Sequence, residues 1–353
     1  KNTIEVNISN IGGSMRILVT ISLLLTMLVD FANAKDIYGC DNTSKIEARQ
    51  SEFKSYVDRN IKRKPNPLTS LHTEGTLPHH GIYDESVNAE KDFDIMLLMS
   101  LSWLAGIDKN NSFDVVRKYI LAWVEVYQPN FNPIDETVFD KFFQAYYIIK
   151  PGLKKSEMER IDAFISFWGY GYLKKLSKQS SNDNWQSHRI KLLTLMSVAI
   201  HDEKLYNAAS KLFKKQIYNN IYSDGHTIDF DKRDALEYTI YDLLPLVQSA
   251  LVAKGQGDDW YSWESQSGSS LKKGLYWLNP YITKAKTHYE FSNTTQEFDR
   301  VRKNAGLGYS GVFLPKSASD LYWSAQLLDK NLLKIAVYTN NSMHAPSFTL
   351  LCN

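Results

Sequence analysis

The chain has 353 residues, which is enough for one large domain or two smaller ones. Its formal net charge is only +2, so electrostatics gives no reason to expect a nucleic-acid partner. Aromatic residues make up 13% of the chain, with 21 Tyr and 8 Trp. This composition is common in secreted proteins that act on carbohydrates, although core packing also explains part of it.

Residues 15–34 read MRILVTISLLLTMLVDFANA, with a basic start, a short apolar run and Ala-Asn-Ala at the end. This order predicts a secretory signal peptide, because the apolar run is shorter than the roughly 20 residues of a spanning helix. An N-terminal membrane anchor is the alternative. We expect residues 1–14 to be an upstream leader or an artefact, and residues 35–353 to form a single periplasmic or secreted domain without stable membrane insertion.

Two cysteines, Cys40 and Cys352, lie near the two ends of this expected domain. In an oxidising compartment they could form one disulfide that ties the ends together, and two free thiols are the alternative.

Helix signals dominate the chain in sequence order. Apolar periodicity and capping residues predict helices over residues 92–106, 112–128, 135–150, 155–176, 185–201, 203–221, 233–255 and about 258–278. Ser112 is a predicted N-cap, and Ser156 begins a Ser-x-x-Glu capping box. Only the tail, residues 332–351, carries some β-like alternation.

Serial helices of this length, joined by short polar loops, predict an all-α fold. We expect an (α/α) toroid, that is, an incomplete barrel of antiparallel helix pairs. A helical solenoid is the alternative, but the chain has no repeat of fixed period. A toroid places helix ends and loops along one cleft, which suits a polymeric ligand.

Two loops interrupt the helices. Residues 63–92 contain His72, His79, His80 and Tyr83, which we expect to bind substrate as a lid over the cleft. A surface loop docked by its prolines is the alternative. The histidine spacing defines no ligand set, so we expect no metal and no other cofactor. The second loop, residues 177–189, ends in the cluster NDNWQSHR.

The stretch RDALEYTIYDLLPL, residues 233–246, places Arg233, Glu237, Tyr238 and Tyr241 at the entrance of an apolar helix. Taken alone, the tyrosines fit a helix core with solvated hydroxyl groups, and Arg233 with Glu237 fits an ordinary i, i+4 pair.

NDNWQSHR, followed about 45 residues later by DGHTIDFDKRDALEYTIYDLLPL, resembles the alginate lyase superfamily of polysaccharide lyases. NPLTSLHTEGTLPHHGIYDES, YQPNFNPIDE and THYEFSNTTQEFDRVR are similar to further segments of that family, so the resemblance spans roughly residues 63–302. It implies a helical toroid and β-elimination of an acidic polysaccharide, with alginate as the expected substrate.

The resemblance also implies catalytic roles for an Asn, a His, an Arg and a Tyr. Asn184 matches the Asn that neutralises the substrate carboxylate, and Tyr241 fits the Tyr that moves protons. Arg233 is the expected cation that makes this phenol more acidic if it faces Tyr241. Trp185 follows Asn184 directly, so His188 is the nearest candidate histidine, with His226, His72, His79 and His80 as rivals.

We expect Trp185, Gln186 and Tyr238 to contact substrate, and Tyr238 is the second choice for the catalytic Tyr. With base and leaving oxygen on one face of the sugar, one Tyr serves as base and then acid; for the C5 epimer, His188 would be the base. The structural alternatives are an Asn184 N-cap and a packing Trp185.

Two other functions fit the sequence. A glycoside hydrolase on the same fold needs two carboxylates, for which the candidates are Asp224, Asp229, Asp231 and Glu237. The second alternative is a non-catalytic uronate-binding protein, which needs no pair of catalytic carboxylates.

Overall fold

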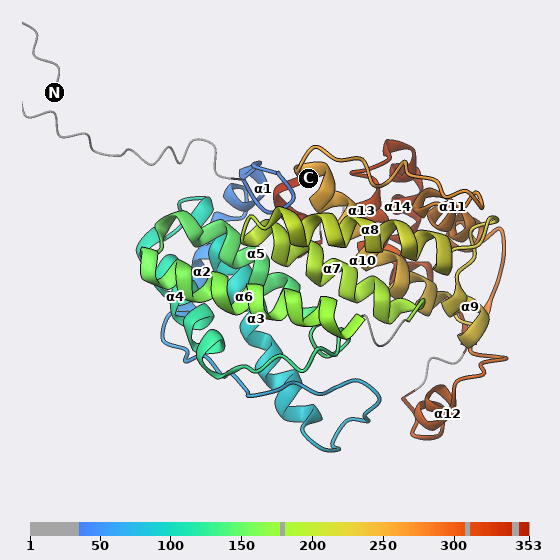
Figure 1. Cartoon of the computed structure of the whole chain (residues 1–353), viewed down its shortest axis with the longest axis horizontal. Coiled ribbons are helices and arrows are strands. Elements are labelled where there is room, and N and C mark those ends of the chain that lie inside the picture. The colour runs from blue at the N-terminus through green and yellow to red at the C-terminus, as the bar shows by residue number, and fades with distance from the viewer. Residues whose placement is uncertain (1–34, 177–180, 308–310, 341–345, 353) are drawn as a thin grey trace, which may run out of the picture. The chain divides into compact units, whose positions relative to one another are not determined.

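The computed structural model describes residues 35–176, 181–307, 311–340 and 346–352 (Figure 1). The expected leader and signal peptide therefore lie outside the described residues. The described chain is mostly helical, and its two-stranded sheet pairs β1 (Tyr289–Glu290) antiparallel with β2 (Gly311–Val312). Within these residues, no helix combines the length and the hydrophobicity that crossing a membrane requires.

The helices follow one another along the chain, and the longest connection lies between α2 and α3. In chain order the α-helices are α1 (Ser44–Glu47), α2 (Gln50–Asn60), α3 (Tyr83–Leu104), α4 (Lys109–Val126), α5 (Asp140–Ile149), α6 (Lys155–Leu176), α7 (Asn184–Ala199), α8 (Glu203–Asn220), α9 (Ile228–Arg233), α10 (Leu236–Gly255), α11 (Leu271–Ile282), α12 (Glu297–Asn304), α13 (Ser319–Ala325) and α14 (Leu333–Thr339). Short 3-10 helices lie at η2 (Thr137–Phe139), η3 (Lys150–Gly152), η4 (Pro315–Ala318), η5 (Lys330–Leu332) and η6 (Ser347–Cys352).

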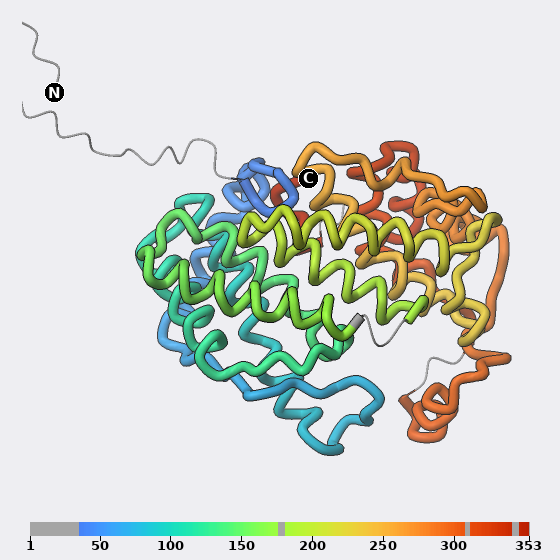
Figure 2. Tube along the Cα trace, viewed as in Figure 1, coloured from blue at the N-terminus to red at the C-terminus, as the bar shows by residue number. Residues whose placement is uncertain are grey.

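Helix α7 is the centre of the fold, because every residue in it except Trp185 is buried. It packs against α5, α6, α8 and α10, and Figure 2 shows α7 and α8 running side by side. Successive helices reverse direction through short loops and form the predicted all-α, incomplete (α/α) toroid. The first turns of α7 and α10 carry the candidate site.

A disulfide joins Cys40 to Cys352, with 5.0 Å between the two Cα atoms. This confirms the pairing of the chain ends. The same segment is docked on α10, because a Cβ atom built on Gly39 would lie 2.9 Å from the Cα of Gly255. The segment around Gly39 and Cys40 is thus held both to Cys352 and to the end of α10.

Several predicted boundaries shift. The helix over residues 155–176 is confirmed. Its capping contact differs from the predicted box of Ser156 and Glu159: the side chain of Glu157 accepts a hydrogen bond from the backbone N–H of Lys154 at 3.2 Å. Helix α3 begins nine residues before the predicted start at 92, because buried Ser86 and Ala89 extend its apolar face through small residues. Ser112 is not an N-cap: it lies inside α4 and donates to the carbonyl of Ile107 at 2.9 Å.

Two predictions in the second half are wrong. The predicted helix over 258–278 begins only at Leu271. The β-like tail is helical where it is described, because the buried Leu332, Ile335, Ala336 and Thr339 follow a spacing of three and four residues, which fits a helix.

We expect the Cys40→Ser/Cys352→Ser double variant to lose about 2–5 kcal/mol of unfolding free energy, because the disulfide restricts the unfolded chain. The bond closes a sequence separation of 312 residues. Urea unfolding followed by tryptophan fluorescence measures the loss. Wild-type protein under a thiol reductant is the control and should match the variant, whereas an unchanged urea midpoint would contradict the prediction.

Candidate active site

A cavity of about 450 Å³ lies where the first turns of α7 and α10 meet the loop before α3. Residues 73–78 and Tyr83 line it on one side. The opposite side comes from the starts of α7 and α10, the end of α9, and α12. Of the predicted catalytic residues, Asn184, Arg233 and Tyr241 line this cavity.

Asn184 is the first residue of α7 and is fixed by a buried carboxylate. Its backbone N–H donates to Oδ2 of Asp229 at 2.8 Å, and its side-chain Nδ2 donates to Oδ1 of the same group. Because a side-chain amide has two N–H groups, one donor remains for a ligand in the cavity. Burial raises the pKa of Asp229 to about 6, while the hydrogen bonds from Asn184 lower it. The expected N-cap is instead Asp183.

Arg233 does not lie on the same helix as Tyr241. It ends α9, the chain turns at Asp234 with φ of 48°, and α10 begins at Leu236. The guanidinium carbon lies 3.7 Å from the ring centroid of Tyr238, and the group is ion-paired with the buried Asp299. The expected pairing with Tyr241 is therefore corrected: the cation lies on the phenol one turn earlier.

The two cavity tyrosines have different electrostatic surroundings. Burial is the main cause that raises the pKa of Tyr238, but the guanidinium groups of Arg233 and Arg302 oppose this rise. Burial also raises the pKa of Tyr241 strongly, and nearby carboxyl groups raise it further. The two ring centroids are 6.1 Å apart in an edge-on arrangement. The pKa values of both phenols are thus raised by burial, and Tyr238 is the one with cationic groups that oppose the rise.

His188 lies beneath the cavity and does not line it. Its side chain is buried, and its ring centroid is 4.2 Å from that of Tyr241. Burial lowers its pKa well below the usual value, and the charge of Lys191 adds to the effect. A neutral, covered imidazole of this kind does not reach the sugar, so the expected role of His188 as the base for the C5 epimer lacks the required contact.

The side chains of the adjacent residues Trp185 and Gln186 lie in different surroundings. Trp185 lines the cavity, as expected for a substrate-binding residue. Gln186 is buried elsewhere, and its Oε1 accepts from Nη1 of Arg189 at 2.5 Å. Helical geometry explains this, because successive residues point about 100° apart.

Residues 73–78 of the loop before α3 line the cavity, and the histidines of this loop do not. Tyr83 lines the cavity, but His79 and His80 are exposed and lie outside the lining. His72 is tied to Asp135 through Nδ1 at 3.1 Å. Asp135 Oδ1 also accepts from the backbone N–H groups of Thr73 and Glu74, both at 2.8 Å, so this buried carboxylate shapes the loop. The predicted closing motion remains a prediction.

The rival site residues are also dispersed. His226 contacts Asp224 at 2.5 Å and Asp231 at 3.4 Å, outside the cavity lining. Asp229 is buried behind Asn184. Among the four carboxylates considered for a hydrolase, Glu237 lines the cavity.

Sequence reasoning missed several lining residues, among them Glu74, Phe298 and Arg302. Glu74 lies between the predicted lid residues His72 and His79, and its position in a loop without periodicity carries no signal for a cavity residue. Phe298 and Arg302 belong to QEFDRVR, which carried the resemblance, and their spacing of four residues on α12 was the available signal.

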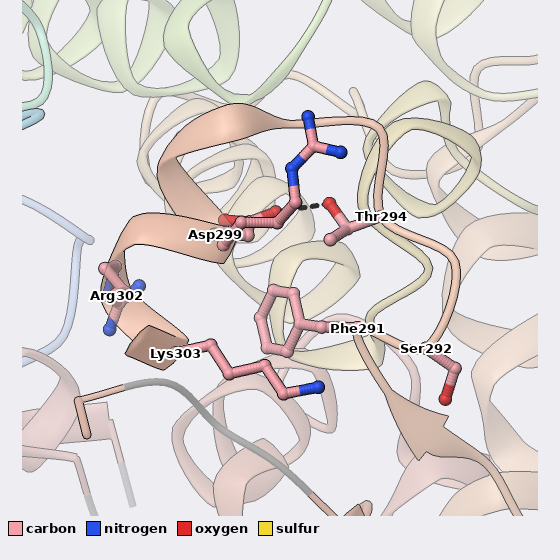
Figure 3. A pocket seen from close by; sticks show the side chains of 7 residues that line it. Phe291, Ser292, Thr294, Asp299, Arg302 and Lys303 are labelled. Carbon is pink, nitrogen blue, oxygen red and sulfur yellow. Dashed lines mark hydrogen bonds between the residues drawn. The ribbon is translucent and has the colours of Figure 1, made fainter. Parts of the chain in front are cut away.

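A second cavity of about 280 Å³ adjoins the first on the far side of α12. Figure 3 shows Phe291, Arg302 and Lys303 around it, with Thr294 hydrogen-bonded to Asp299 at 2.6 Å. Arg302 lines both cavities, which makes them neighbours along one surface.

We expect Arg233→Met to raise the pKa of the Tyr238 phenol, because it removes the guanidinium that favours the phenolate. NMR titration of tyrosine labelled at Cζ measures this, with Tyr238→Phe assigning the signal. Lys286→Met is a matched control, since Lys286 lies 5.7 Å from the ring of a different residue, Tyr281. Equal Tyr238 titrations in wild type, Arg233→Met and Lys286→Met would contradict the proposed pairing.

Comparisons with known proteins give one consistent result. The profile of the Alginate lyase family matches residues 40–288. No curated protein matches the chain. An alginate lyase structure from Bacteroides ovatus is similar, with a TM-score of 0.60 and 14% identity, over 86% of this chain and 92% of that one.

Alginate lyase A1-III from Sphingomonas species A1 has a TM-score of 0.60 and 15% identity, over 91% of this chain and 97% of that one. A variant of that enzyme complexed with a tetrasaccharide has a TM-score of 0.59 and 14% identity, over 91% and 96% of the two chains. At such identities these structures show the shared helical toroid. Because the family profile covers most of the chain, this protein belongs to the alginate lyase family and is a polysaccharide lyase.

Proposed function

We propose that the protein binds alginate and cleaves it by β-elimination, including its mannuronate-containing segments. The observation that carries this proposal is that Asn184, Tyr238, Tyr241 and Arg233 line one cavity. Two similar structures are complexes of A1-III variants with a tetrasaccharide, one with a histidine replaced by alanine and one with a tyrosine replaced by phenylalanine.

The first requirement of the reaction is to stabilise the carboxylate beside C5 as negative charge develops on it. The free N–H of the Asn184 amide meets this requirement, because Asp229 already occupies the other donor and fixes the amide orientation. A single well-placed donor of this kind is worth about 2.7–4 kcal/mol in a transition state.

The second requirement is a base and an acid, and we assign them to different tyrosines. Tyr238, supported by Arg233, takes the C5 proton as the phenolate. The C5 electron pair forms the C4–C5 double bond, the C4–O bond breaks, and Tyr241 gives its proton to the leaving oxygen. Groups whose surroundings separate their pKa values are suited to such a division. Proton exchange with solvent then returns Tyr238 to the phenolate and Tyr241 to the phenol.

The two phenols also suggest a substrate stereochemistry. They project from neighbouring turns of α10, with 6.1 Å between ring centroids, so both reach the sugar from one side. This suits a uronate whose C5 hydrogen and O4 lie on the same face, as in mannuronate.

We expect Tyr238→Phe and Tyr241→Phe each to lower kcat by about 100-fold or more, because each removes one proton-transfer group. The near-ultraviolet absorbance of the conjugated product measures the rate, and calorimetry with the polymer should give a nearly unchanged Kd. If Tyr238→Phe keeps full activity while Tyr241→Phe does not, one phenol performs both steps and the division is wrong.

The same assay separates the rival functions. A hydrolase would release reducing ends without the absorbance, and a non-catalytic binder would produce neither signal.

We further propose that the polymer continues from the main cavity across α12 into the second cavity. Arg302 borders both spaces, and Lys303 borders the second, so cations follow the expected path of the uronate carboxylates.

We expect Arg302→Gln to raise KM for the polymer several-fold, with the effect decreasing at high ionic strength as charge is screened. Lys272→Gln is the control, since it removes a positive charge outside both cavity linings. Equal KM values for the two variants would contradict the path.

We also propose that the protein is secreted or periplasmic. The Cys40–Cys352 disulfide supports this, because such bonds persist in oxidising compartments. Fractionation of expressing cells, followed by immunoblotting of each compartment, tests it; recovery in the cytosol alone would contradict it.

A further inference from the structure

The buried ring beneath Tyr241 has a defined set of partners. Nδ1 of His188 lies 2.6 Å from Oγ1 of Thr137 in η2. The other nitrogen, Nε2, is buried and makes no direct hydrogen bond in the structure. Which nitrogen carries the proton therefore depends on Thr137.

Lys191 determines the direction of the hydrogen bond from Thr137. The buried ammonium group contacts Oδ2 of Asp140 at 2.9 Å, the carbonyl of Thr137 at 2.9 Å and Oγ1 of Thr137 at 2.8 Å. An ammonium has three donors and no acceptor, so these contacts use all three and make Oγ1 an acceptor. Among the described residues, His188 is the remaining hydrogen-bond partner of Oγ1, and the hydroxyl proton is directed to Nδ1.

A ring that accepts at Nδ1 carries its proton at Nε2 when it is neutral. The positive charge of Lys191 disfavours a second proton, and so does burial. The opposing influence is the backbone carbonyl of Tyr241, which favours protonation of the ring.

Pro245 explains why that carbonyl is available. In an α-helix, the carbonyl of Tyr241 would accept from the N–H of residue 245, but proline has none. Pro245 lies inside α10. The helix thus presents a carbonyl without its usual helical partner close to the ring of His188.

We propose that Lys191 and Thr137 lock His188 as the neutral Nε2–H tautomer, and that this ring is a positioning residue that seats Tyr241 at the cavity. His188 acts through Tyr241 and has no direct role as a base. The arrangement links η2, α7 and α10 through four side chains: Thr137, His188, Lys191 and Tyr241.

The test is nitrogen NMR of histidine-labelled full-length protein, with His188→Gln assigning the signals. In wild type we expect Nδ1 of His188 at the shift of an unprotonated nitrogen and Nε2 at that of a protonated one. We expect no titration of this ring between about pH 5 and 8, where an ordinary histidine titrates.

Lys191→Met is the decisive variant. It keeps the Thr137 hydroxyl but removes the ammonium that orients it, so the hydroxyl proton can turn away from Nδ1, Nδ1–H can donate to Oγ1, and the second tautomer should appear. Thr137→Val should also release the lock, whereas Thr137→Ser should retain it. A protonated Nδ1 in wild type, a titrating ring, or an unchanged tautomer in Lys191→Met would each overturn the assignment.

The effect on catalysis rests on the proposed role of Tyr241. We expect Thr137→Val to lower kcat about 3- to 10-fold with little change in KM, as for loss of one orienting hydrogen bond. Thr137→Ser should restore it, with thermal unfolding checking that both variants fold. Unchanged kcat with a released tautomer would refute the positioning role. If Tyr241→Phe is itself fully active, the catalytic proposal fails, and the NMR result still decides the tautomer.

Discussion

Asp229 is the carboxylate on which the candidate site depends. It accepts both the backbone and the side-chain donors of Asn184, and so holds the start of α7 against α9. Four residues after Asp229, Arg233 ends α9 and covers Tyr238, the first cavity tyrosine of α10. One buried acid therefore sets the relative position of the amide donor and the guanidinium. Its position has an energetic cost, because burial raises the pKa of this carboxyl to about 6.

The site separates two phenols that the sequence presents as equivalent. Tyr238 and Tyr241 are three residues apart on the same helix, yet guanidinium groups oppose the burial effect only at Tyr238. Tyr241 instead packs on the neutral ring of His188, whose own partners lie on η2 and α7. Such a difference in surroundings is how one residue type can supply both an acid and a base. The same arrangement buries His188 outside the cavity lining, which supports the positioning role that we propose for it.

Much of the fold could be predicted, because helix periodicity is a local property. The helix over 155–176 was located correctly, and those over 185–201 and 203–221 nearly so. Failures arose where burial of small or polar residues extended a helix, as at Ser86 in α3. The helix break at Asp234, which the periodicity does not predict, has a larger consequence. It places Arg233 at the end of α9 and away from Tyr241, its expected partner. Aspartate adopts the left-handed conformation at a low energetic cost, so the break needs no glycine and the sequence pattern does not indicate it.

The sequence by itself determined the helical class, the two cysteines available for pairing, and the residue types Asn, Arg and Tyr from which the site is built. These follow from composition, local spacing and resemblance, and need no knowledge of distant contacts. Only the tertiary structure decided which phenol meets the cation, which histidine is buried, and which loop residues line the cavity. Those outcomes depend on contacts between segments tens of residues apart, such as Asp229 with Asn184 and Asp135 with Thr73. Electrostatic effects of this kind act over a few ångströms in space, whatever the separation along the chain.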